Sequence, residues 1–173
     1  AQWIGSPQHP LTARVIVNRL WQKHFGRGIV ATLENFGWMG EAPTHQALLD
    51  WMAVEFMNRG WSIKQINKLM MMSEAYQMAS AFEHAGNAAA DLENHYLWRF
   101  RPQRLEAEIV RDSLLHVAGA LDASHGGPEI HHHEGESSRR RSVYFRHAYE
   151  RKMRFVELFD GPSEMECYRR NES

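Results

Sequence analysis

The sequence contains a single cysteine, Cys167, among its 173 residues. One thiol cannot form a disulfide within the chain, and it cannot supply a cysteine-rich zinc or iron–sulfur site. It also excludes a CxxCH haem-attachment motif, so we expect no cofactor in this chain. Arg169 and Arg170 follow closely and would lower the pKa of the thiol, but no partner histidine is near in the sequence. We interpret Cys167 as a structural or incidental thiol.

Long hydrophobic runs and a large net charge are also absent. No stretch of about 18 apolar residues occurs, so we expect no membrane span. No basic start is followed by an apolar segment, so no signal peptide is visible. The 20 basic and 21 acidic residues give a net charge of -1, which argues against a dedicated nucleic-acid-binding domain.

No complete catalytic motif is present. The sequence lacks GxSxG, P-loop, GxGxxG and HExxH patterns, so acyl transfer, P-loop nucleotide use, dinucleotide binding and zinc-protease chemistry have no support. The chain is 43% hydrophobic and has six tryptophans, eight phenylalanines and nine methionines, which indicates a folded chain. These features favour a non-enzymatic helical protein.

Apolar residues spaced three and four apart predict a mainly α fold. The expected helices cover residues 11–25, 44–59, 63–72, 103–121 and 152–159. Gly26 and Gly60 are expected to end the first two helices, and Ser62 with Gln65 forms a capping-box pattern for the third. We expect one multi-helix domain over residues 1–173, with long loops.

The connections differ in composition. Residues 26–43 hold four glycines and form a long irregular loop, whose aromatic residues we expect to pack over the core. The alanine-rich residues 80–91 are interpreted as a surface link. Residues 122–141 are rich in glycine, histidine, serine and arginine, and predict a mobile loop. Residues 142–145 have strand-like composition and are expected to pair with residues 129–131 in one short β-hairpin.

Three adjacent histidines, His131, His132 and His133, are the candidate metal ligands. Imidazole is the commonest metal ligand near neutral pH. Side chains alternate between the two faces of an extended chain, so three successive histidines do not readily converge on one ion. We therefore expect an exposed loop and no metal, with these three residues as the candidates if a metal does bind.

Four polar residues are the candidate catalytic residues if the first and fourth helices pack together: Arg14, Asn18, Glu106 and Asp112. Arg14 and Asn18 are four apart and share a helix face. A guanidinium suits a carboxylate or phosphate ligand. It suits a structural ion pair with the acidic residues of the fourth helix equally well, and we prefer that interpretation. Replacement of Arg14 would then lower stability rather than abolish binding.

Several segments carry a family resemblance. They are residues 9–30 (HPLTARVIVNRLWQKHFGRGIV), 34–37, 49–51, 104–108, 142–144, and 159–160 followed by Cys167. Together they cover nearly the whole chain, and it resembles the planctomycete PSD-type domain. That family is catalogued without a known function, and it occurs in large bacterial proteins.

The resemblance implies a context for the chain. The parent protein would be exported or periplasmic, and a neighbouring cytochrome-type domain would carry covalent haem. The family's domain usually continues past the last residue here, so we expect a fragment of a longer domain. The resemblance implies no catalytic residues. The His131–His133 tract and the Arg139–Arg141 run are departures in a region expected to vary.

These observations favour a non-catalytic binding or interaction module of a multidomain exported protein. Its expected partners are neighbouring domains of the same polypeptide and a glycan or protein ligand. The alternative is part of a hydrolytic or redox-linked enzyme acting on extracellular polymers such as polysaccharide, and a third possibility is a spacer supporting a haem domain. A binder should expose aromatic side chains, whereas an enzyme should have a pocket where arginines and carboxylates converge.

Overall fold

A computed structural model describes residues 2–148, 151 and 153–159 of the chain. The chain divides into two compact units, unit 1 (residues 1–103) and unit 2 (residues 104–173), and each is described by itself. The described residues form seven α-helices, so the predicted mainly α fold is confirmed. None of these helices has the length and hydropathy needed to cross a membrane. The single-domain organisation stays a prediction, and Cys167 lies outside the described residues.

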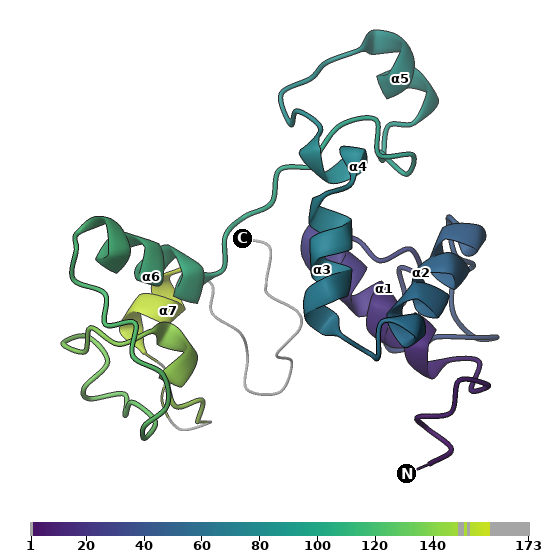
Figure 1. The fold of residues 1–173 in the computed structure, drawn as a ribbon. Coiled ribbons are helices and arrows are strands. Elements are labelled where there is room, and N and C mark those ends of the chain that lie inside the picture. Colours follow the sequence, from purple (N-terminus) through teal and green to yellow (C-terminus); the bar gives the residue numbers. More distant parts are fainter. Residues whose placement is uncertain (1, 149–150, 152, 160–173) are drawn as a thin grey trace. The chain divides into compact units, whose positions relative to one another are not determined.

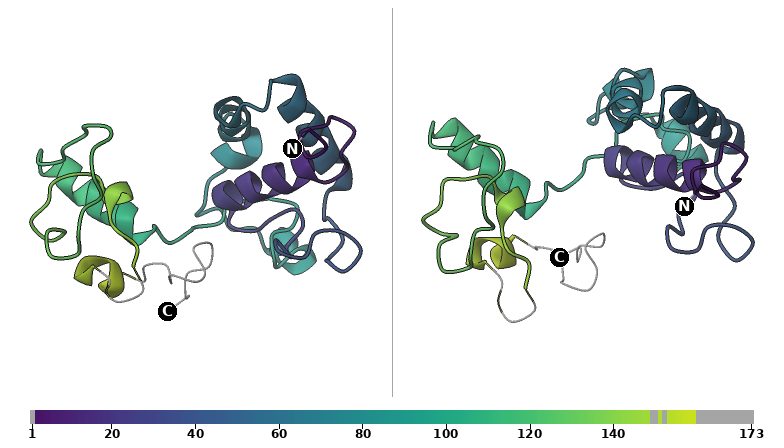
Figure 2. Two further views of the ribbon diagram at one scale, coloured as in Figure 1. Left: turned by 90° about the horizontal axis from the view of Figure 1, so that it is seen from below. Right: turned by 60° about the horizontal axis from the view of Figure 1, so that its bottom comes forward.

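Unit 1 is built on three helices that pack against one another. They are α1 (Thr12–Phe25), α2 (Gln46–Asn58) and α3 (Ile63–Met71), which lie side by side in Figures 1 and 2. Two short helices follow, α4 (Glu74–Gln77) and α5 (Ala85–Ala90). The last of these lies within the predicted alanine-rich link, where the His84 ring accepts a hydrogen bond from the Asn87 amide at 3.1 Å.

The ends of the main helices follow the expected local signals. Gly26 closes α1 with φ of 81°, a left-handed conformation that glycine adopts without steric cost. The Ser62 hydroxyl accepts a hydrogen bond from the Gln65 amide at 3.4 Å and so caps α3. Both predicted signals are confirmed.

The core of unit 1 draws its buried side chains from one stripe on each main helix and from the loop after α1. Its fully or nearly buried apolar residues are Ala13, Val17, Trp21, Phe25, Ile29, Val30, Leu49, Met52, Ala53, Phe56, Ile66 and Met70. The rings of Trp21 and Phe25 stack with centroids 4.0 Å apart. Phe36 packs on this core as predicted, but Trp38 does not, because its side chain is 100% exposed.

Unit 2 contains α6 (Ala107–Val117), the 3₁₀ helix η1 (Ser142–Tyr144) and α7 (Arg154–Leu158). The connection between α6 and α7 folds back beside α6 (Figure 2). The predicted helix over 103–121 is shorter than expected at both ends. The backbone is still extended at Glu106, and Gly119 takes a left-handed φ of 66° just after the helix.

The predicted β-hairpin is wrong. Ile130 and Phe145 do pair, but as an isolated parallel bridge, with the Ile130 amide donating to the Tyr144 carbonyl at 2.8 Å. Among the described residues there are only such isolated bridges and no sheet. The reason is local: residues 142–144 turn into a 3₁₀ helix, which interrupts the extended backbone that a hairpin strand requires.

A buried guanidinium, that of Arg111, ties the long connection to α6. It donates to the carbonyls of Gly135 (3.2 Å), Ser138 and Arg140 (3.1 Å), and to the hydroxyl of Ser142 (3.1 Å). Burial lowers the pKa of Arg111 from its ordinary value, and the neighbouring Asp112 opposes this effect. The predicted mobile loop, residues 122–141, is therefore anchored by hydrogen bonds, and its mobility stays a prediction.

We expect Arg111→Met to lower the free energy of unfolding of unit 2 by about 3 kcal/mol, because buried carbonyl groups lose their donor. All six tryptophans lie in unit 1, so tryptophan fluorescence reports on that unit alone. The urea-unfolding transition measured by far-UV circular dichroism should therefore shift to lower urea concentration. The transition measured by tryptophan fluorescence should stay the same. Arg139→Met, at an exposed position of the same connection, is the matched control. Equal unfolding curves for the two variants would contradict the anchoring role of Arg111.

Candidate functional site

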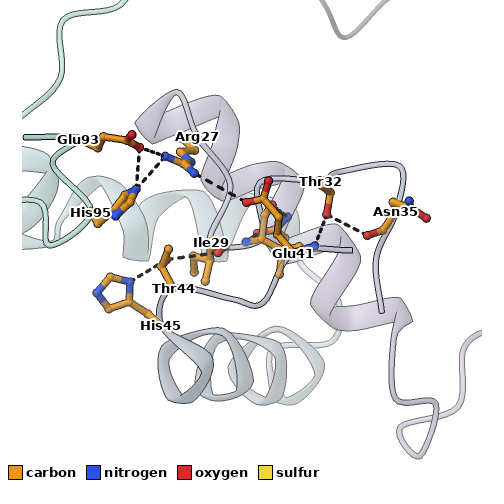
Figure 3. Close-up of polar contacts among 11 residues, drawn as sticks. Arg27, Ile29, Thr32, Asn35, Glu41, Thr44, His45, Glu93 and His95 are labelled. Carbon is orange, nitrogen blue, oxygen red and sulfur yellow. Dashed lines mark hydrogen bonds and ion pairs between the residues drawn. The ribbon is translucent and has the colours of Figure 1, made fainter. Parts of the chain in front are cut away.

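Four charged or titratable side chains converge beside the core of unit 1, and we call them the Arg27 cluster: Arg27, Glu41, Glu93 and His95 (Figure 3). Arg27 Nη1 donates to Glu93 Oε2 at 2.7 Å, and Arg27 Nη2 lies 3.9 Å from Glu41 Oε2. His95 Nε2 lies 2.8 Å from Arg27 Nη1 and 3.1 Å from Glu93 Oε2. The cluster therefore joins two loops, residues 26–43 and 91–100, that are far apart in the sequence.

A small cavity of about 40 Å³ lies at this cluster. Its apolar lining includes Trp21 and Phe25 of the core. Its polar lining consists of Arg27, Thr44, His45, Glu93, Asn94, His95 and Arg101. A space of this size holds a few water molecules or one small polar group rather than a whole ligand.

A buried asparagine, Asn18, positions the loop that carries Arg27. Its side-chain oxygen accepts from the Val30 amide and its side-chain nitrogen donates to the Val30 carbonyl, each at 2.9 Å. Gly28 packs directly on this amide, because a Cβ atom there would lie 2.9 Å from Asn18 Nδ2 and 2.4 Å from the Val30 carbonyl oxygen. The side chain of Asn18 thus fixes the backbone on the carboxyl side of Arg27.

A second asparagine, Asn94, fixes the opposite loop in the same manner. Its side chain donates to the Arg99 carbonyl at 2.8 Å and accepts from the Arg99 amide at 3.3 Å. The carboxylate of Asp91 accepts from the amides of His95 and Tyr96, each at 2.8 Å. Burial acts to raise the pKa of Asp91, but these N–H donors outweigh it, so the pKa lies below its ordinary value.

The loop beyond Arg27 is closed at its base by Thr32 (Figure 3). The Thr32 hydroxyl donates to the Asn35 carbonyl at 3.0 Å and accepts from the Glu41 amide at 2.9 Å. A Cβ at Gly40 would lie only 1.7 Å from the Asn35 carbonyl oxygen, so glycine is required for this closure. The closed loop presents Trp38 fully to solvent.

An aromatic pair flanks the cavity. The rings of His45 and Tyr96 meet edge to face with centroids 5.7 Å apart, and Tyr96 is 78% exposed. His45 Nδ1 lies 3.0 Å from the hydroxyl of Thr44, whose amide in turn donates to the Ile29 carbonyl at 2.9 Å. Tyr96 is therefore an exposed aromatic residue that is held in a defined position.

The electrostatics of the cluster favour the ionised form of the Glu93 carboxylate. The hydrogen bond from Arg27 is the largest effect that holds the pKa of Glu93 below its ordinary value, followed by the charge of Arg27 and by His95. A carboxylate with a lowered pKa is a poor general acid at neutral pH. The arrangement suits charge compensation and binding better than proton transfer.

Of the predicted site residues, Arg14 and Asn18 have structural partners. Arg14 Nε donates to Asp50 Oδ1 at 2.5 Å and so joins α1 to α2. The expected ion pair with the fourth helix is therefore replaced by one with Asp50. This bond and a second one from Gln46 lower the pKa of Asp50. Asn18 is 1% exposed and fully used by Val30.

The other two candidates, Glu106 and Asp112, belong to unit 2. Asp112 Oδ1 accepts from the Ser142 amide at 2.9 Å and from its hydroxyl at 2.7 Å. Both acidic residues line a groove of about 750 Å³ along α6, together with His116 and His147. A catalytic role for these residues stays a prediction.

The three adjacent histidines do not gather around one point. His132 and His133 contact each other through their rings, with centroids 3.9 Å apart, while His131 Nδ1 lies 3.4 Å from Arg146 Nη1. Burial and the neighbouring imidazoles and arginines lower the pKa of His132. Within the part of the chain that the structure describes, no group of three histidine, cysteine or acidic residues could hold a metal ion.

No sequence pattern pointed to the residues of the Arg27 cluster. Arg27 lies within the segment of family resemblance, but Glu93 and His95 follow it by more than 60 residues, in a loop without a recognisable motif. The usable signals were the two asparagines and the glycines at the loop bases, because these residue types recur where a backbone is held in an irregular conformation.

Asn18→Ala should lower the free energy of unfolding of unit 1 by about 3 kcal/mol, because the buried amide and carbonyl of Val30 lose both partners. Urea unfolding followed by tryptophan fluorescence measures this change. Asn58→Ala, at an exposed position at the end of α2, is the control. An unchanged unfolding midpoint for Asn18→Ala would show that the loop does not depend on this side chain.

The carboxyl group of Glu93 should titrate below its ordinary pKa of 4.5 in the folded protein. The Glu93–Arg27 contact then makes its full contribution to the free energy of unfolding above pH 4.5. That contribution is lost as the pH falls through the lower pKa that Glu93 has in the folded protein. Carboxyl ¹³C NMR measures the midpoint, which should rise in Arg27→Gln. An unchanged Glu93 titration midpoint in Arg27→Gln would refute the contact. Arg59→Gln serves as the control, because Arg59 pairs with Glu55 instead.

Comparisons with known proteins give one result. No curated protein and no solved structure matches the chain. A family model, PSD1, described as a protein of unknown function (DUF1553), matches residues 1–173. This match spans both compact units, including the loops of the Arg27 cluster. The chain therefore belongs to the PSD1 family.

Proposed function

We propose that unit 1 is a non-catalytic binding module whose ligand is an extracellular glycan. The observation that carries this proposal is the position of Trp38. Its side chain is 100% exposed, yet it lies on a loop whose base is closed by the hydrogen bonds of Thr32. A loop whose backbone is already held in place loses less conformational entropy on binding than a free one, which favours affinity.

The chemistry of the exposed side chains fits a sugar ligand. An indole offers a flat apolar face to the C–H face of a sugar ring, and tryptophan and tyrosine are the residues that most often dominate binding energy at interfaces. Met39, next to Trp38, is also 80% exposed and widens the apolar surface. Tyr96 provides a second exposed aromatic ring beside polar groups that can bind hydroxyls. Trp98 differs, since its indole donates to the Asp91 carbonyl at 2.9 Å.

The state of Glu93 supports binding rather than catalysis. Arg27 and His95 engage the carboxylate, and its lowered pKa keeps it ionised. Hydrolysis of a glycosidic bond by the usual route needs a carboxylic acid whose pKa is raised. Glu93 is therefore poorly suited to act as the acid in such a reaction.

The context of the module is part of the proposal. We place it in a multidomain exported protein beside cytochrome c-type domains, with haem bound by a neighbouring domain and with these domains as partners. The support for this context is the family resemblance of the sequence. The alternative function is a hydrolytic or redox-linked enzyme acting on polysaccharide. The feature in its favour is the groove along α6 that contains Glu106 and Asp112.

A glycan array probed with the full chain should identify bound oligosaccharides, and Trp38→Ala should weaken their binding at least about tenfold by loss of the exposed anchor. Isothermal titration with the best array ligand measures the affinity. Trp3→Ala is the matched control, because Trp3 is also an exposed tryptophan of unit 1, at 72% exposure.

Two results would refute the proposal. One is an array on which no glycan binds the folded chain. The other is an affinity for the best array ligand that neither Trp38→Ala nor Trp3→Ala changes. Release of shorter sugars from a bound oligosaccharide, detected by chromatography, would favour the enzyme alternative, and loss of that activity in Asp112→Asn would assign it to the groove along α6.

A further inference from the structure

We infer that the cavity at the Arg27 cluster binds a carboxylate group, so that the glycan ligand carries a uronic acid. The glycan part of this inference rests on the proposed function, whereas the carboxylate part rests on the cavity alone. The inference of a carboxylate ligand depends on Arg101. It lines the cavity and makes no hydrogen bond or ion pair with any other residue that the structure describes.

The charges that line the cavity leave a positive excess. Arg27 and Arg101 face one carboxylate, that of Glu93, and Glu93 is already engaged by Arg27 and His95. Arg27 is additionally close to Glu41, at 3.9 Å. Arg101 is exposed, and it is the charged lining residue that has no partner among the described residues, so its guanidinium is free to bind an anion.

A carboxylate suits this arginine in shape as well as in charge. A guanidinium presents its N–H groups in a planar fork that matches the two oxygens of a planar carboxylate. The cavity of about 40 Å³ admits such a group but excludes a sugar ring. The ring to which the carboxylate is attached would then lie outside the cavity, on the side of the exposed Tyr96.

His45 provides a complementary contact for a hydroxyl. The hydroxyl of Thr44 donates to the Ile29 carbonyl at 3.3 Å, so towards His45 it acts as an acceptor. His45 Nδ1 therefore carries the proton that Thr44 accepts at 3.0 Å. In the neutral ring His45 Nε2 is then an acceptor, and it has no hydrogen-bond partner among the described residues. A hydroxyl donor beside a carboxylate is the combination that a uronic acid offers.

The test uses monomeric galacturonate, its methyl ester and galactose as probes. Each is titrated into the full chain while ¹H–¹³C NMR follows the ring signals of His45 and His95. Galacturonate should shift both signals saturably, and the ester and galactose should bind at least about tenfold more weakly because they lack the negative charge. Arg101→Gln should reduce galacturonate affinity to that same level.

Arg19→Gln is the matched control, because Arg19 is an exposed arginine of unit 1 that does not line the cavity. Its affinity for galacturonate should equal that of the unchanged protein. Equal affinity for galacturonate and galactose, or equal loss in Arg19→Gln and Arg101→Gln, would overturn the carboxylate site. Tryptophan fluorescence of each variant confirms that unit 1 remains folded.

The two proposals fail in different ways. If neutral oligosaccharides bind through Trp38 but galacturonate does not shift the histidine signals, the proposed function stands and the carboxylate site is wrong. If galacturonate binds in an Arg101-dependent manner but no oligosaccharide depends on Trp38, the carboxylate site stands and the glycan-binding function is wrong.

Discussion

The two hydrogen bonds between Asn18 and Val30 are the constraint on which the arrangement of unit 1 depends. They attach the irregular chain after α1 to the helix itself and satisfy backbone groups that are buried in the core. An unsatisfied buried amide or carbonyl costs about 1–3 kcal/mol, so the side chain cannot be replaced without moving the loop. The contact thereby fixes the backbone next to Arg27, while Thr32 closes the part of the loop that carries Trp38.

The site repeats that principle in the facing loop, where Asn94 holds Arg99. Two asparagine side chains thus place Arg27 on one side and the loop of Glu93 and His95 on the other. Exposed ion pairs contribute little to stability by themselves. The cluster is therefore held mainly by the backbone contacts beneath it.

Unit 2 achieves order by a different route. Its small apolar core leaves a long connection that Arg111 organises by donating to several carbonyls, while its guanidinium lies 4.7 Å over the ring of Phe145. A buried cation is stable only where hydrogen bonds replace its lost hydration. Removal of Arg111 would therefore lower the free energy of unfolding by more than the loss of one apolar contact, because several carbonyl groups would lose their hydrogen-bond donor at once.

Local signals in the sequence were sufficient for the three main helices of unit 1. The apolar spacing of α1, α2 and α3, the left-handed glycine Gly26 and the cap at Ser62 each act within one turn of chain, and the structure agrees with all of them. The hairpin prediction failed because residues 142–145 have strand-like composition, while the contacts of Ser142 with α6 favour a 3₁₀ turn. Amino-acid composition alone does not show which of these two effects is stronger.

The amino-acid sequence was enough to predict the helical class and the ends of the main helices of unit 1, and to assign the chain to the PSD1 family. Tertiary packing, in contrast, pairs Arg14 with Asp50 and Arg27 with Glu93. It also decided that Trp38 faces solvent. The physical reason is that helix propensity and capping act between near neighbours in the chain. Ion pairs and exposure depend on loops brought together by packing across many residues.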